Sequence, residues 1–199
     1  MRRAPRATCG ATSVWRGASP WTGSTRTRQT HGDREAPPFA RHLYFEEDGG
    51  FRADLGTWEA GVLREELADG KLVGWLRNLD RKPWSLEVPY ASGGLIRPMF
   101  PNLVIVRNDP DGEGFLFDIL EPHDPSLGDN FEKAVGLARF AERHGHLFGR
   151  IQLIRKQRSP AGGEKFYRLG IDRTDVQKRL RLVTSNAQLD AVFDDEAEC

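Results

Sequence analysis

Asn102, Glu121 and His123 are the residues whose types and spacing point most clearly to chemistry. Asn102 precedes one apolar run of strand length, Glu121 follows the next, and the polar residues 108–112 between the runs predict a turn. Opposed side chains of an antiparallel pair lie about 5 Å apart, so Asn102 and Glu121 are expected to meet at the open end of this hairpin. His123 is expected on the same side, two residues beyond Glu121.

Further carboxylates lie close to this group in the sequence. Asp118, Asp124 and Asp129 add oxygen donors near Glu121 and His123. An acidic cluster with an imidazole suits a hard divalent cation such as Mg²⁺. The alternative is that these residues belong to loops at the rim of a sheet and that Asp129 caps a helix.

Such a hairpin needs further strands to hold it. The strongest strands, 103–106 and 115–120, carry apolar residues at odd and even positions, as strands covered on both faces do. The turn between them predicts the register, with Arg107 opposite Leu116. Further strands are predicted at 42–45, 72–76, 84–88, 151–154 and 166–169.

Capping residues and apolar spacing predict the helices. Thr57 is expected to cap a first helix, and Asp129 opens the clearest helix, with Glu132 at the capping-box position. Two terminal helices are expected to begin at the caps Thr174 and Ser185. These elements predict an α/β (α+β) fold with a mixed central sheet flanked by helices.

The composition narrows the class of protein. The chain has 199 residues, of which 38% are hydrophobic and 29% charged, enough for one modest core. Basic and acidic residues number 29 each, which excludes a uniformly basic nucleic-acid coat. The two cysteines lie near opposite ends, which disfavours a disulfide scaffold. No apolar run has the length of a membrane span, so no membrane partner is expected.

The balanced charge hides a basic N-terminal segment. Residues 1–38 are rich in Ser, Thr, Gly, Pro and Arg and lack apolar periodicity, which predicts a disordered tail. A transit peptide, a nucleic-acid arm and a linker remain open as its role. A folded domain is expected over 39–172, with a C-terminal helical extension over 173–199.

Four short motifs in the expected domain resemble a known pattern. They are Trp75-Leu76-Arg77-Asn78, Trp84 to Pro89-Tyr90, Pro98 to Leu103, and Asp118 to His123. The series resembles the C-terminal endonuclease domain of type III restriction enzyme subunits and related helicase-nucleases, in the PD-(D/E)XK nuclease superfamily. This resemblance covers roughly residues 40–172 and implies a restriction-endonuclease-like fold.

The resemblance also implies roles for residues at matching positions. In that family a Pro-Asp and an acid-x-Lys on neighbouring strands bind magnesium and orient the attacking water. Asn102 stands at the Asp position and Glu121 at the acid position, so both are implied metal ligands. His123 stands at the Lys position, where an imidazole can act as a base near neutral pH.

Two helices would complete a site of this kind. The family has an assisting acid on its first helix, for which Glu59 is the first choice here and Glu66 the second. Lys133, on the helix after the hairpin, would supply an ammonium group. The alternative for Lys133 is an exposed helix lysine.

Arg150, Arg155, Lys156 and Arg158 form a basic stripe around one predicted strand. Such a stripe is expected to contact DNA phosphates. Alternating charge on a solvated strand face is the other interpretation.

These features together predict a Mg²⁺-dependent DNA endonuclease of restriction or repair type. The competing hypothesis is a catalytically degenerate nuclease fold that binds DNA or a partner within a helicase assembly. The Glu121 constellation favours the first, and Asn102, in place of a carboxylate, favours the second. The expected partners are DNA and a helicase or modification subunit, and the expected compartment is the cytoplasm.

Overall fold

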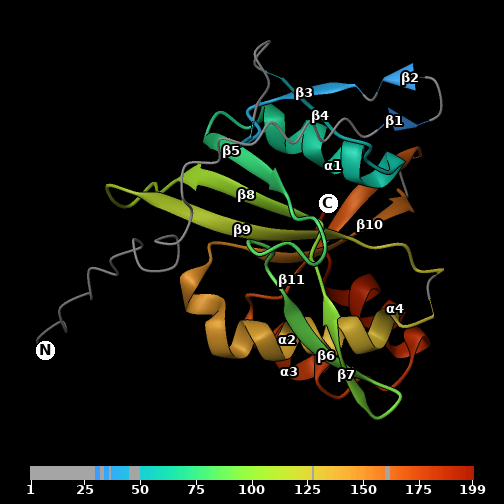
Figure 1. The fold of residues 1–199 in the computed structure, drawn as a ribbon. Coiled ribbons are helices and arrows are strands. Elements are labelled where there is room, and N and C mark those ends of the chain that lie inside the picture. The colour runs from blue at the N-terminus through green and yellow to red at the C-terminus, as the bar shows by residue number, and fades with distance from the viewer. Residues whose placement is uncertain (1–29, 32–33, 36, 45–49, 127, 160–161) are drawn as a thin grey trace, which may run out of the picture.

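A five-stranded sheet forms the centre of the fold in this computed structural model (Figure 1). Neighbouring strands run antiparallel, except that β9 and β10 are parallel. The sheet is therefore mixed, as predicted. In spatial order its strands are β11 (Glu164–Gly170), β10 (Ile151–Arg158), β9 (Phe115–Pro122), β8 (Leu103–Asn108) and β5 (Leu72–Arg77).

Parts of the N-terminal region are not described by the structure. Most of the segment expected to form a disordered tail, including 1–29, lies outside the described residues. The described residues are 30–31, 34–35, 37–44, 50–126, 128–159 and 162–199. Short strands pair two by two before the first helix: β1 (Thr30–His31) with β2 (Arg34–Glu35), and β3 (Pro38–Ala40) with β4 (Gly50–Arg52).

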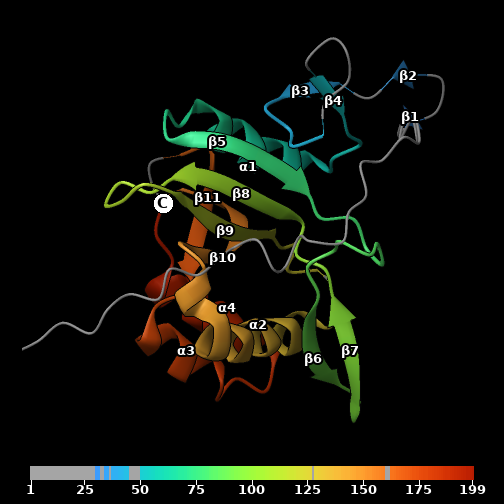
Figure 2. The same cartoon turned by 60° about the vertical axis from the view of Figure 1, so that its left-hand side comes forward.

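Helices cover both faces of the sheet (Figures 1 and 2). On one face lies α1 (Thr57–Ala68), and on the other lie α2 (Asn130–His144), α3 (Thr174–Leu180) and α4 (Asn186–Glu196). A 3₁₀ turn, Gly145–Leu147, follows α2. In the part of the chain that is described, no helix is long and apolar enough to cross a membrane.

Adjacent residues of β9 contribute to two separate cores. Ile119 packs in the core shared with α2, α3 and α4, whereas Leu120 packs in the core shared with α1. They reach different cores because successive side chains of a strand point to opposite faces. Both side chains are fully buried. This confirms the prediction that the strand is covered on both faces.

The register of β8 and β9 agrees with the register predicted from the turn. Arg107 pairs with Leu116, and Ile105 pairs with Asp118. A shift by one residue would exchange the faces of every side chain on the strand. The predicted register therefore places the polar residues at the end of the hairpin on the correct side.

The ribbon formed by β6 (Val88–Ser92) and β7 (Leu95–Met99) was not expected from the sequence. Two glycines, Gly93 and Gly94, form its turn with φ of 57° and 77°, values that side chains disfavour. The ribbon lies against α2 (Figure 2), where the Ser92 hydroxyl donates to Glu132 at 2.9 Å. Glu132 is thus engaged with the ribbon rather than in the predicted capping box.

Two other predicted strands differ from the structure. The strand at 84–88 is wrong, because 84–87 form no strand and are held by Asn78, whose amide exchanges two hydrogen bonds with the Leu86 backbone. The strand at 42–45 is replaced by β3, while His42 forms an isolated bridge to Trp75. Residue 45 lies outside the described residues.

The helix starts follow the predictions to within one residue. Thr57 and Thr174 are the first residues of α1 and α3 rather than their caps. Gly56 precedes α1, and its amide donates to the Glu59 carboxylate. Ser185 caps α4 as predicted, accepting a hydrogen bond from the Gln188 amide.

We predict that Gly136→Ala separates α2 from the ribbon. A Cβ at Gly136 would lie 2.4 Å from Tyr90 Cβ and 3.0 Å from Tyr90 Cα, so the helix must move. Overpacking of this kind typically lowers the free energy of unfolding by about 1–3 kcal/mol. Urea unfolding should show this loss. Gly145→Ala is the matched control, because no atom lies within 4 Å of its added Cβ. Equal stability of the two variants would contradict the proposed close packing.

Candidate functional site

Asn102 and Glu121 meet where β8 begins and β9 ends. The Asn102 amide N–H donates to Glu121 Oε2 at 2.7 Å. The Asn102 side-chain Nδ2 lies 3.4 Å from the Pro122 carbonyl oxygen, a long separation for a hydrogen bond. The structure therefore brings together the two residues that the hairpin register predicted to meet.

A pocket of about 580 Å³ opens beside this contact. It collects residues from the start of α1, the ends of β8 and β9, the ribbon and the start of α2. Six of the residues proposed from the sequence line it: Asn102, Glu121, His123, Asp124, Glu59 and Lys133. The pocket is thus assembled from segments that are far apart in the sequence.

Burial dominates the electrostatics of Glu121. Removal from water raises the pKa of this carboxyl to about 7, although the Asn102 amide and the nearby Lys133 favour its charged form. The charge of Glu59 contributes to this upward shift of the pKa. Glu121 therefore lies in a range where a small change of environment decides its charge near neutral pH.

His123 is more deeply buried than its predicted role requires. Its side chain is 2% exposed, and its Nε2 has no hydrogen-bond partner among the described residues. The pKa of His123 is lowered to about 4, mainly by burial and also by the charges of Arg155 and Lys133, against the opposing charges of Asp129 and Asp124. The expected base with a pKa near neutrality is therefore not supported by the surroundings of this imidazole.

Glu59 lies at the mouth of the pocket but has partners of its own. Its Oε1 accepts from Arg77 Nη1 at 2.6 Å, and its Oε2 accepts from the Gly56 amide at 2.8 Å. These contacts tie the start of α1 to the end of β5. Glu59 is consequently held in place beside the pocket by a cation and a backbone amide.

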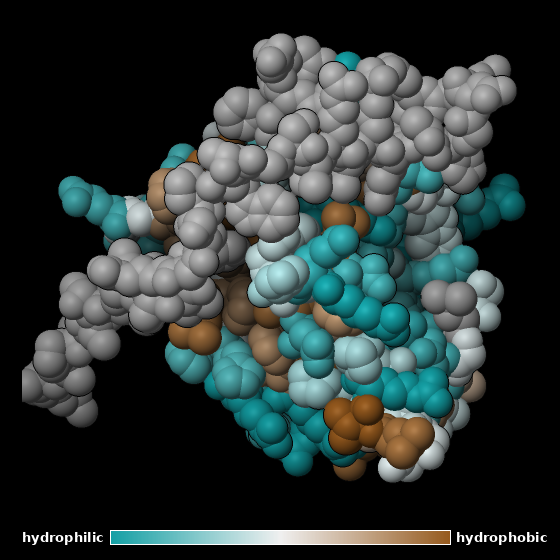
Figure 3. All heavy atoms as spheres, viewed as in Figure 1, coloured by the Kyte–Doolittle hydropathy of each residue, from teal (hydrophilic) through white to brown (hydrophobic). Residues whose placement is uncertain are grey.

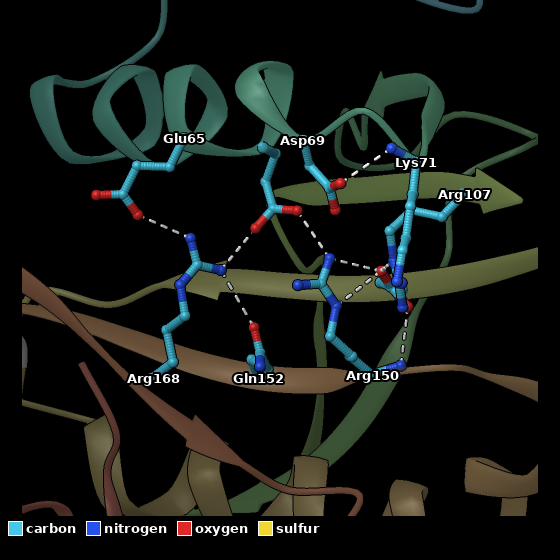
Figure 4. Close-up of polar contacts among 9 residues, drawn as sticks. Glu65, Asp69, Lys71, Arg107, Arg150, Gln152 and Arg168 are labelled. Atoms are coloured by element: carbon cyan, nitrogen blue, oxygen red, sulfur yellow. Dashed lines mark hydrogen bonds and ion pairs between the residues drawn. The ribbon is translucent and has the colours of Figure 1, made fainter. Parts of the chain in front are cut away.

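Glu66, the second choice for the helical acid, belongs to another cluster. Its carboxylate accepts from Arg150 and Arg168, each at 2.7 Å. Figure 4 shows both arginines reaching from the sheet toward α1. Asp118, which the sequence placed near the site, joins this cluster through Arg107 and Arg150. Neither carboxylate lines the pocket.

Lys133 is held at the rim by a tyrosine–aspartate pair. Its Nζ lies 3.0 Å from Asp129 Oδ1, and the Tyr90 hydroxyl donates to Asp129 Oδ2 at 2.9 Å. Asp129 also precedes α2, as predicted, although its side chain makes no capping hydrogen bond. Lys133 thus reaches the pocket with its ammonium group already paired.

Three residues of the predicted basic stripe, Arg150, Arg155 and Lys156, form ion pairs with carboxylates of the chain. Arg150 binds Asp118 and Glu66, and Lys156 pairs with Glu164. Arg155 is only 3% exposed, donates to Asp190 and lies over the Phe193 ring. These contacts do not support phosphate binding by Arg150, Arg155 or Lys156, because each cation would have to leave a carboxylate.

Asn78 is a supporting residue that the sequence did not single out for a role. Its amide N–H donates to the Asn102 carbonyl oxygen at 3.0 Å, while its side chain holds Leu86. It lies in the Trp75–Asn78 motif, together with Arg77, the partner of Glu59. The motif was therefore the available signal. Asn78 holds the Asn102 backbone and Arg77 holds the Glu59 carboxylate.

The donor set at the pocket is small. Among the described residues, no group of three or more His, Cys, Asp or Glu side chains could hold a metal ion together. Beside the Glu121 carboxylate the pocket has the side chain of Asn102 and the residue Pro122, and its other carboxylates come from Glu59, Asp80 and Asp124. A cation here would depend on neutral oxygen donors as well as on Glu121.

Comparison with known proteins gives a family match over most of the chain. The model of the YagJ family matches residues 40–198. The chain is also similar to Protein YagJ of Escherichia coli (strain K12), with 28% identity over 154 residues. The match covers 77% of this chain and 60% of that relative, so the chain spans about 60% of the relative's length. No solved structure matches the chain.

We predict that Glu121 makes stability depend on pH. A carboxyl whose pKa is raised from 4.5 to about 7 by folding stabilises the folded chain while it is protonated. This contribution is full below pH 4.5 and is lost as the pH rises through about 7, on the order of 3 kcal/mol. Glu121→Gln should remove that loss.

Urea unfolding of both chains at pH 5 and pH 8 tests the prediction. Glu121→Gln should gain stability relative to the parent chain at pH 8 and not at pH 5. The same difference at both pH values would show that Glu121 is not buried as described.

Proposed function

The chain belongs to the YagJ family, and we propose that it is a divalent-metal-dependent DNA endonuclease that hydrolyses phosphodiester bonds. The observation that carries this proposal is the contact between Asn102 and Glu121 at the pocket. It joins the two positions that the resemblance to type III restriction endonuclease domains implies as metal ligands. The first helix adds Glu59 and the following helix adds Lys133, again as the resemblance implies.

The charges at the pocket support a requirement for a cation. Four carboxylates line it, from Glu59, Asp80, Glu121 and Asp124, against the ammonium of Lys133. The carboxylates that are ionised would repel a phosphodiester. A bound divalent cation reverses the local sign, so substrate binding should depend on the metal as strongly as cleavage does.

Such an ion would have a single buried carboxylate, that of Glu121, with neutral oxygens as its other ligands. Glu121 is buried, and its Oε2 accepts a hydrogen bond from the backbone N–H of Asn102. The Asn102 side chain is held weakly, because its separation from the Pro122 oxygen is 3.4 Å. Glu121, Asn102 and the Pro122 carbonyl would hold the ion. When bound, it would stabilise charge on the phosphate and lower the pKa of a water.

Other residues would position these groups. Arg77 and Gly56 hold Glu59 at the mouth of the pocket, and Asn78 holds the backbone of Asn102. Lys133 is 23% exposed and can approach an anionic substrate from the rim. As a DNA endonuclease, the chain is proposed to act in the cytoplasm. Its proposed partner is a helicase or modification subunit.

A degenerate nuclease fold that binds without cleaving is the second candidate. The neutral Asn102 removes one charged ligand, and Lys133 is already paired with Asp129. Both features weaken catalysis more than they weaken a fold that grips DNA or a partner protein. This candidate predicts binding that does not depend on a divalent cation.

Plasmid cleavage separates the two candidates. The full chain with supercoiled DNA and Mg²⁺ should yield nicked and linear products. Glu121→Gln should slow cleavage by about 10²-fold or more, as expected when one main electrostatic contributor is lost. Glu113→Gln, at an exposed position on the β8–β9 turn, is the matched control and should cleave like the parent. Unchanged cleavage by Glu121→Gln would exclude this pocket as the active site.

Asn102→Asp tests the weak ligand. Two neighbouring carboxylates repel until a cation binds, so Mg²⁺ should raise the melting temperature of this variant more than that of the parent. Cleavage should rise in parallel. If neither changes, and the parent binds DNA equally well in EDTA, the binding-module candidate replaces the nuclease.

A further inference from the structure

We infer that Tyr90 and Asp129 are positioning residues, which hold the ammonium group of Lys133 at the pocket so that it binds a phosphate of the DNA. The inference rests on the proposed function, because the phosphate belongs to the substrate proposed there. It starts from two linked polar contacts. The Tyr90 hydroxyl donates to Asp129 Oδ2 at 2.9 Å, and Lys133 Nζ lies 3.0 Å from Asp129 Oδ1.

The tyrosine distinguishes this arrangement from an ordinary ion pair on a helix surface. Asp129 and Lys133 are four residues apart at the start of α2, a spacing at which exposed pairs are weak. Tyr90 comes from β6 and is only 6% exposed. Its backbone packs directly on α2, because a Cβ at Gly136 would lie 3.0 Å from Tyr90 Cα. A buried side chain of another element therefore fixes the carboxylate that Lys133 contacts.

The ammonium group is thereby kept at the pocket. Lys133 lines the pocket together with Glu121 and His123. Burial is the main cause of the shifted pKa of both neighbours, and the charge of Lys133 acts on each toward a lower value, as expected for a cation beside them. An ammonium group has three N–H donors, so the contact with Asp129 leaves donors for a phosphate oxygen.

The gain from this arrangement is preorganisation. A lysine has a flexible four-carbon stem, and fixing it when a ligand binds costs conformational entropy. A side chain that is already held loses less entropy on binding. Asp129 also places a negative charge beside the ammonium group, which opposes an anion. The benefit must therefore come from orientation, and the Tyr90 hydroxyl supports orientation without adding charge.

Tyr90→Phe tests the inference, because it removes the hydroxyl and changes no charge. Loss of this hydrogen bond should release Lys133 and raise the KM for plasmid cleavage about two- to tenfold, with kcat unchanged. If the parent binds DNA without cleaving it, the Kd in EDTA should rise by the same factor. Tyr167→Phe, which removes the hydroxyl of a half-buried tyrosine on β11, is the matched control and should behave like the parent.

A double-mutant cycle with Lys133→Gln shows whether the hydroxyl acts through the lysine. Lys133→Gln should weaken DNA binding and reduce its dependence on salt by about 0.9 in the slope of log Kd against log salt, as expected for one lost phosphate contact. Adding Tyr90→Phe to Lys133→Gln should then have no further effect. An equal loss of affinity from Tyr90→Phe in both backgrounds would overturn the inference, because the hydroxyl would be acting elsewhere.

Acetylation by acetic anhydride reports on Lys133 without DNA. An amine held as an ammonium ion against a carboxylate reacts slowly, so Lys133 of the parent should react more slowly than the exposed Lys178 on α3. Tyr90→Phe should narrow this difference about two- to tenfold. Equal rates in the parent would overturn the inference even if the variant does not fold.

The measurements also separate this inference from the proposed function. If the parent cleaves DNA and Tyr90→Phe leaves KM unchanged, the inference is wrong and the proposed function stands. If the parent neither binds nor cleaves DNA, the proposed function fails and the phosphate contact fails with it.

Discussion

Two buried carboxylates, Asp118 and Glu66, hold the first helix to the sheet, and the pocket depends on that attachment. Asp118 is fully buried and accepts from Arg107 and Arg150, and Arg150 also donates to Glu66 (Figure 4). Arg168 on β11 joins from the opposite edge. Breaking one of these pairs would leave a buried charge without its partner, so the network holds α1 against the strands. That placement sets Glu59 at the mouth of the pocket.

The pocket lies at one end of the sheet because strands of opposite direction meet there. β8 begins and β9 ends at this end of the sheet, so the side chains just outside their paired residues come together. The parallel strand β10 supports the end of β9 through the hydrogen bond to the His123 amide. The polar residues are thus placed by the backbone ladder, and the helices contribute the charges around them.

Much of this arrangement could be predicted because it depends on short-range signals. The turn at 108–112 and the apolar runs beside it gave the register, and the register gave the contact between Asn102 and Glu121. The mixed sheet with helices on both faces also followed from the order of the elements. These features need only neighbouring residues to be read correctly.

The rest depends on contacts between distant parts of the chain, which periodicity does not report. Arg150 was interpreted as a phosphate contact, but its guanidinium pairs with Glu66, 84 residues earlier. The low pKa of His123 reflects burial and the charges of Lys133 and Arg155, which come 10 and 32 residues later in the sequence. The ribbon was missed because the residues before it resemble a strand, whereas the side chain of Asn78 holds them in a loop.

The ribbon of β6 and β7 also has a consequence for association between molecules. Leu95 and Ile96 near its turn are 64% and 74% exposed, and Figure 3 shows a hydrophobic patch where Figure 1 places that turn. An exposed apolar edge strand would normally invite another chain to add a strand. Pro89 and Pro98 face each other in the ribbon and have no amide hydrogen to donate. The ribbon can therefore present apolar side chains while resisting growth into a larger intermolecular sheet.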